Sequence, residues 1–139
     1  MLEAVGKDSG MTDYAIQNLQ EIEDSAVKFG LSPQMETHFA RKDLGAETLG
    51  LSLQRLAPNV RQPFGHRHEF QEEVYVILSG GGRVSLGDEV LDVRPWDAVR
   101  VAPGTVRAFE AGPEGLELLA FGAHTDSGDV ESVEGFWAS

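Results

Sequence analysis

Two histidines two residues apart, His66 and His68, are followed by a carboxylate, Glu73, and then by a run of β-branched residues. On a β-strand, residues i and i+2 face the same way, so the two imidazoles point together while Arg67 points away. A hairpin to the next strand can bring Glu73 opposite them. Two neutral imidazoles and one carboxylate form the facial ligand set that suits Fe(II), with Mn, Ni, Co or Zn as alternatives. The spacing therefore predicts half of a metal site.

The surrounding sequence alternates between apolar and polar residues with the period of a β-strand. This alternation covers 49–54, 73–78 and 98–101, and turn-forming residues separate the runs. The glycine run 80–82 is interpreted as a hairpin turn. Many short strands about 8 to 12 residues apart, without helices between them, are typical of an antiparallel sandwich or barrel. The sequence predicts an all-β fold whose strands carry the candidate ligands.

One short helix is expected before the strands. In the segment 18–29 the apolar residues recur at spacings of three and four, which predicts an amphipathic helix. Asn18 and Glu21 are suited to cap its start, and Gly30 is suited to end it. The alternating strand pattern begins only after this glycine, so the helix is expected to lie outside the barrel.

The ends of the chain are treated separately from the fold. Residues 1–11 are interpreted as a mobile N-terminal extension or a remnant of expression cloning, because a second possible start follows at Met11. Residues 12–139 are expected to form a single domain, which the length permits. The acidic C-terminal stretch ends in Phe136 and Trp137, an apolar pair expected to dock on the barrel or on a second subunit.

Composition narrows the classes of partner. The 139 residues include 23 acidic and 11 basic side chains, a formal net charge of −12. This balance repels nucleic-acid backbones and anionic membranes, and no apolar run approaches the roughly 18 residues of a membrane span. The chain has no cysteine, so a metal must be bound by His, Asp or Glu. Without a secretory signal pattern, a cytoplasmic location is expected.

The spacing around the two histidines resembles the first conserved motif of the cupin family of small β-barrels. That motif reads Gly, five residues, His-x-His, three or four residues, Glu, six residues, Gly. His66, His68, Glu73 and Gly80 match it, whereas Val60 stands at the leading Gly. The resemblance implies a double-stranded β-helix, or jelly-roll barrel, here with the short N-terminal helix added.

The second cupin motif is degraded. It reads Gly, five residues, Pro-x-Gly, two residues, His, three residues, Asn, and the stretch 96–111 occupies its place. Gly104 matches, but Trp96 replaces the first Gly and Arg107 stands where the last metal histidine is expected. An arginine has no lone pair to offer, so Arg107 cannot be a metal ligand.

Two readings of the site follow. In the first, His66, His68 and Glu73 hold a divalent ion such as Fe, Mn, Ni or Zn. In the second, Arg107 replaces the metal by pairing with Glu73 inside the barrel. Under the first reading His38 or His124 would complete the shell, although either is more often an ordinary surface or core residue.

Two functions are accordingly expected for a barrel that binds a small, anionic organic molecule. One is a metal-dependent enzyme of the dioxygenase or isomerase type, in which Arg107, Tyr75 and Phe109 contact the substrate. The other is a metal-free, non-catalytic binding or sensory module. The resemblance also implies a homodimer, since single-domain cupins often pair.

Overall fold

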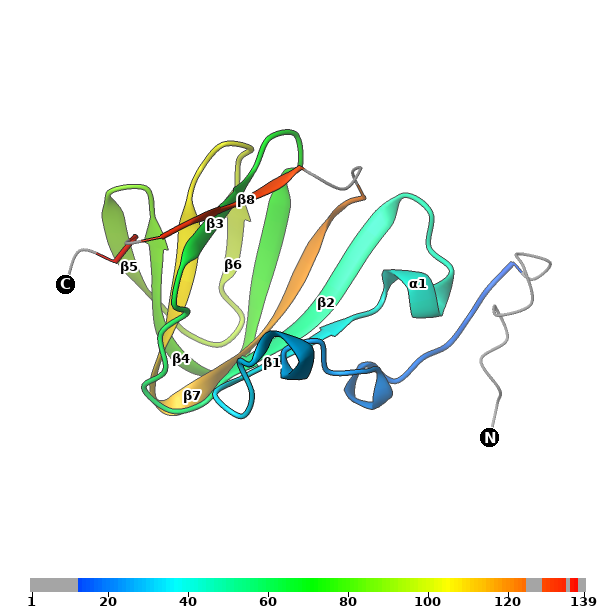
Figure 1. The fold of residues 1–139 in the computed structure, drawn as a ribbon, viewed down its shortest axis with the longest axis horizontal. Coiled ribbons are helices and arrows are strands. Elements are labelled where there is room, and N and C mark those ends of the chain that lie inside the picture. The colour runs from blue at the N-terminus through cyan, green and yellow to red at the C-terminus, as the bar shows by residue number, and fades with distance from the viewer. Residues whose placement is uncertain (1–12, 125–128, 135, 138–139) are drawn as a thin grey trace.

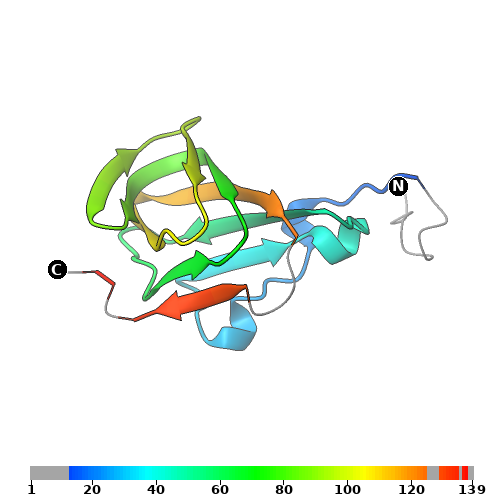
Figure 2. The same cartoon turned by 90° about the horizontal axis from the view of Figure 1, so that it is seen from above.

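The computed structural model describes residues 13–124, 129–134 and 136–137, and the expected extension 1–11 lies outside them. Eight strands form one sheet, which curls so that its two halves face each other (Figures 1 and 2). The all-β prediction is confirmed. In the described part of the chain, no helix is both long and apolar enough to cross a bilayer. The elements in chain order are η2 (Leu19–Glu21), η3 (Val27–Phe29), β1 (Met35–Phe39), α1 (Arg41–Leu44), β2 (Leu49–Leu56), β3 (Gly65–His68), β4 (Glu73–Leu86), β5 (Glu89–Val93), β6 (Ala98–Val101), β7 (Arg107–Ala123) and β8 (Val130–Val133).

Strand β7 is the centre of the sheet. It pairs antiparallel with β2, β3 and β4, while β4 also pairs with β5 and β6. The outermost strand on one side is β8, which pairs with β3 (Figure 2). This order places His66 directly opposite Arg107 at the start of β7, whereas Glu73 at the start of β4 pairs with Gly122 near the end of β7. The curl of the sheet therefore gathers the motif residues at one place.

The expected hairpin turn at 80–82 is wrong. Strand β4 runs through these glycines without turning back, and its register against β7 shifts between Gly80 and Gly82. Gly80 has φ +73°, and a Cβ there would lie 2.0 Å from the carbonyl oxygen of Gly115. The glycines thus form a bulge where two long strands approach closely and bend, which lets one strand serve both halves of the barrel.

The expected helix over 18–29 is also wrong. Only two separate 3-10 turns form, and the backbone at Ile22 is extended between them. The side chain of Asp24 accepts hydrogen bonds from the backbone N–H groups of Ala26 and Thr37, and Ser25 N–H donates to the Thr37 carbonyl. These bonds tie the segment to β1, so tertiary pairing overrides the helical pattern.

The barrel interior holds one apolar cluster and a polar end. The cluster includes Leu56, Tyr75, Ile77 and Leu118. Along β2, the side chains of Ser52 and Gln54 share the face of Leu56, so these two polar residues face inward. Leu53 is buried on the opposite, outer face, where the 3-10 turn η2 contacts β2. The alternation in β2 therefore predicts a strand but not which of its faces is internal.

Candidate functional site

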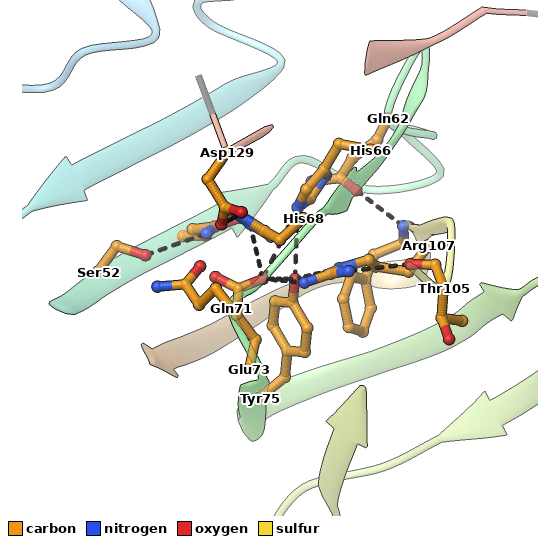
Figure 3. Close-up of polar contacts among 12 residues, drawn as sticks. Ser52, Gln62, His66, His68, Gln71, Glu73, Tyr75, Thr105, Arg107 and Asp129 are labelled. Carbon is orange, nitrogen blue, oxygen red and sulfur yellow. Dashed lines mark hydrogen bonds and ion pairs between the residues drawn. The ribbon is translucent and has the colours of Figure 1, made fainter. Parts of the chain in front are cut away.

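The structure brings His66, His68 and Glu73 together as predicted. The expected hairpin between their strands is wrong, since among the described strands β3 pairs with β7 and β8 and not with β4. The two histidines lie on β3 and the glutamate begins β4 (Figure 3). Glu73 Oε1 lies 3.8 Å from His66 Nε2 and 3.4 Å from His68 Nε2. One ligand atom from each of the three residues lies within 4.8 Å of the other two. All three side chains are partly buried, and His66 is the most exposed at 26%.

Arg107 contacts the same carboxylate oxygen, Glu73 Oε1. Its side chain is completely buried, and Nη2 donates to Glu73 Oε1 over 2.5 Å. Nε donates to the Tyr75 hydroxyl at 3.0 Å, and Nη1 donates to the Thr105 carbonyl at 2.9 Å. The guanidinium is therefore held by a hydrogen bond from each of its nitrogens (Figure 3).

Tyr75 contacts both Glu73 and Arg107 through its hydroxyl group. Its hydroxyl donates to Glu73 Oε1 at 2.5 Å and lies 3.5 Å from His66 Nε2. Burial, followed by the charge of Glu73, raises the pKa of Tyr75 well above its usual value. The hydroxyl consequently stays protonated and acts as a hydrogen-bond donor to the carboxylate.

Glu73 is held in its ionised form. Burial alone would raise the pKa of this carboxyl group, but contacts with the four polar side chains around it outweigh burial and place the pKa far below its usual range. Those contacts are, in decreasing order, with His66, His68, Tyr75 and Arg107. A negative charge at this position therefore persists across the physiological pH range.

Asp129 supports His68 from outside the barrel. His68 Nδ1 lies 3.0 Å from Asp129 Oδ2, while Asp129 Oδ1 accepts the backbone N–H of Phe70 at 2.6 Å. Only 9% of Asp129 is exposed. The two residues also border a groove of about 460 Å³ beside β3. The lining of this groove consists of Arg67, His68, Glu69, Gly104, Asp129, Val130 and Glu131.

The chemistry of these donors fits a divalent metal ion. Ligand atoms about 2.0–2.2 Å from one ion lie roughly 3.0–3.5 Å from each other, which is close to the separations of the imidazole nitrogens from Glu73. The carboxylate is ionised and a second carboxylate lies behind His68, as is usual for ligating histidines. The Arg107 charge opposes a cation, but Glu73 compensates for it. The residues thus fit a three-ligand site with an arginine beside it.

The other predicted residues lie away from this centre. His38 is buried between the Ile22 carbonyl and Glu36 on β1, and His124 follows the end of β7. Neither belongs to the group of possible ligands found in the described part of the chain. Phe109 packs edge-on against Tyr75 with ring centroids 4.9 Å apart, inside the apolar cluster.

Some residues of the site are not predicted by the sequence. Asp129 is 61 positions from His68, so no spacing links them. Ser52 and Gln54 point into the barrel, and their apolar neighbours in β2 suggest the opposite orientation. The alternation of polar and apolar residues in β2 predicts that Ser52 and Gln54 share one face, and this is the sequence signal that could have identified them.

The chain was compared with known proteins. Residues 52–122 match the family model described as a cupin domain. No curated protein sequence matches the chain. Solved structures with similar folds include the following three. A cupin protein from Bacteroides fragilis is 22% identical, with a TM-score of 0.67, over 92% of this chain and 94% of that one. The polyketide cyclase RemF from Streptomyces resistomycificus is 20% identical, with a TM-score of 0.69, over 88% and 85%. A sugar phosphate isomerase from Silicibacter pomeroyi is 15% identical, with a TM-score of 0.68, over 86% and 92%.

Proposed function

Because the chain belongs to the cupin family, we propose that it is a metal-dependent enzyme acting on a small anionic organic molecule. His66, His68 and Glu73 hold a divalent ion such as Fe, Mn, Ni or Zn. When bound, such an ion supplies Lewis-acid or oxygen-activating chemistry. The double-stranded β-helix of the family is the scaffold in this proposal.

One observation carries the proposal. Two imidazole Nε2 atoms converge on a carboxylate that is kept ionised, and His66 remains the most exposed of the three side chains. Nitrogen and oxygen donors placed together in this way are the donor types that suit these divalent ions. An ion held here has protein ligands on one side and an approach from solvent beside His66.

Arg107 and Tyr75 position Glu73 in this scheme. Their hydrogen bonds hold the carboxylate oxygen that also lies near the two histidines. The Arg107 side chain is fully buried and its charge is offset by Glu73, so it neither contacts nor attracts a substrate directly. A bound divalent ion would add two positive charges, which Glu73, already paired with Arg107, does not offset. We base the preference for an anionic substrate on this added charge.

The reaction type is proposed from chemistry and from the structural neighbours. One of the neighbours named above is a sugar phosphate isomerase, and a sugar phosphate is a small anion that carries carbonyl and hydroxyl groups. Lewis-acid activation of a carbonyl or hydroxyl group suits such a substrate. An isomerase is therefore the first choice, and a dioxygenase is the alternative that the same ligand set supports.

Elemental analysis tests the proposal. The protein is produced without a polyhistidine tag, dialysed against metal-free buffer and reloaded with Fe(II), Mn(II), Ni(II) or Zn(II). We expect stoichiometric metal in the parent protein, loss of the metal in His68→Gln and retention in His124→Gln, an exposed histidine away from the site. Oxygen consumption by the loaded protein would select the dioxygenase over the isomerase. A parent protein that refuses every added metal refutes the proposal.

A second function is favoured by one contact. Arg107, without any exposed surface, pairs with Glu73 over 2.5 Å and could replace the cation altogether. The protein would then be a metal-free binding or sensory module for a small anion. If so, Arg107→His should create metal binding where there was none. If a metal is already bound, the same substitution should alter its affinity far less.

The assembly and location are part of the same proposal. A homodimer is proposed, because among the described strands β8 pairs only with β3, so its other edge has no strand partner. A cytoplasmic location is proposed from the sequence. Sedimentation at several protein concentrations tests the dimer, and a single species of monomer mass would refute it.

A further inference from the structure

We infer that Asp129 is a positioning residue that fixes the tautomer of His68, so that the C-terminal segment forms part of the metal site. The inference rests on the proposed function. It starts from the 3.0 Å contact between Asp129 Oδ2 and His68 Nδ1. The second carboxylate oxygen, Oδ1, accepts the backbone N–H of Phe70. Asp129 is thus held from both sides.

The contact determines which ring nitrogen carries the proton. An ionised carboxylate only accepts hydrogen bonds, so Nδ1 of His68 must be the donor. Nε2 also faces a carboxylate, Glu73 Oε1, but at 3.4 Å against 3.0 Å for the Asp129 contact, so the single proton of the neutral ring stays on Nδ1 and the lone pair lies on Nε2. A metal ligand needs this lone pair. Asp129 therefore prepares His68 for coordination before any ion arrives.

The segment that carries Asp129 is anchored to the barrel at both ends. Strand β8 follows Asp129 directly and pairs with β3 from Val130, opposite His68, to Val133. Farther along, the Trp137 indole N–H donates to the Gln62 carbonyl at 2.8 Å. The expected docking of the C-terminal aromatic pair on the barrel is thereby confirmed for Trp137. The carboxylate is consequently presented on an ordered strand edge.

Asp129→Asn tests the inference with almost no change of shape. The Phe70 N–H needs an acceptor, so the amide oxygen of Asn must face it and the amide NH₂ must face His68. A donor at that position requires a lone pair on Nδ1 and moves the ring proton to Nε2. We expect the affinity for Zn(II) or Mn(II), measured by competition with a chromophoric chelator, to fall 10- to 100-fold.

Glu131→Gln is the matched control. Glu131 lies on β8, the strand directly after Asp129, and lines the same groove, where it pairs with Arg67 and not with His68, so the variant removes one nearby negative charge. We expect its metal affinity to stay within about twofold of the parent value, because exposed charges interact weakly. Equal losses in the two variants would mean that charge near the site, and not the tautomer, sets the affinity, and would overturn the inference.

Nitrogen-15 NMR of the His68 ring in the metal-free protein at alkaline pH gives a readout that needs no metal. The parent protein should show a protonated Nδ1 and a bare Nε2, and Asp129→Asn should show the reverse. A parent ring protonated on Nε2, or still protonated on both nitrogens, overturns the inference. If the tautomers behave as expected but no variant binds metal, the proposed function fails while the positioning by Asp129 stands.

Discussion

The buried pair of Arg107 and Glu73 offers the sharpest test of how the site is built. We consider Arg107→Met, Glu73→Gln and the double variant. Methionine and glutamine have nearly the volume of the residues they replace, so little of the change in unfolding free energy comes from new cavities. Each single variant leaves the other charge in the barrel interior without its main partner. The double variant removes both charges together.

The expected magnitudes follow from burial. The Arg107 side chain has no exposed surface and that of Glu73 is 15% exposed, so solvent compensates little for a lost partner. Removing one member of a buried pair costs about 3–5 kcal/mol, whereas replacing the whole pair by neutral groups of similar size costs much less. We therefore expect the double variant to lose no more stability than either single variant, with a coupling free energy of at least about 2 kcal/mol.

Urea denaturation at neutral pH with a chelator present measures these free energies without the contribution of bound metal. Arg83→Met is the matched control, since Arg83 pairs with Glu110 on β7 but its side chain is 46% exposed. That change should cost less than about 1 kcal/mol. The account of a preformed, charge-compensated site would be refuted if the free energies lost in the two single variants add up in the double variant. It would also be refuted if Arg107→Met costs as little as the control.

Three further changes probe the site and its scaffold. Burial raises the pKa of Glu73, but the surrounding contacts lower it by more than burial raises it. The stability that Glu73 contributes should therefore be complete above the ordinary carboxyl pKa of about 4.3 and be lost as the pH falls below it. Urea midpoints measured against pH should decrease less steeply at acid pH in Glu73→Gln than in the parent protein. Tyr75→Phe removes a hydroxyl bonded to the site and should cost about 1–3 kcal/mol in the same assay, and an unchanged midpoint would contradict the network. Gly80→Ala should lower the melting temperature far more than Gly87→Ala. Both glycines have positive φ, so Gly87→Ala should cost about 1–2 kcal/mol, but of these two only Gly80 would place a Cβ against backbone, 2.0 Å from the Gly115 carbonyl oxygen. Equal shifts in melting temperature would refute the close approach of the two strands.

The candidate ligands could be predicted because their spacing is local. His66 and His68 share a strand face by the period of two, and Glu73 is only five positions farther along the chain. Arg107 could be placed beside them only through the resemblance to a family motif. Asp129 could not be placed at all, since its contact with His68 depends on how β8 pairs with β3.

The errors in the fold have a common cause. The segment 18–29 has a helical period, but its backbone donors are used by Asp24 and by the edge of β1. The glycine run 80–82 resembles a turn, but the close backbone of β7 requires residues without a Cβ there. In both places long-range pairing, which a local pattern does not contain, decided the conformation.

The position of Arg107 explains how a cation site and a buried arginine are compatible. The residue type excludes Arg107 as a ligand, and from sequence alone its charge should repel a metal ion. In the structure one oxygen of Glu73 lies near both histidines and accepts a hydrogen bond from Arg107. The arginine is thereby compensated before any ion binds. All three nitrogens of Arg107 are engaged, so displacing it would leave a buried charge without partners, and the proposed metal and substrate would approach beside His66, the most exposed of the three candidate ligands.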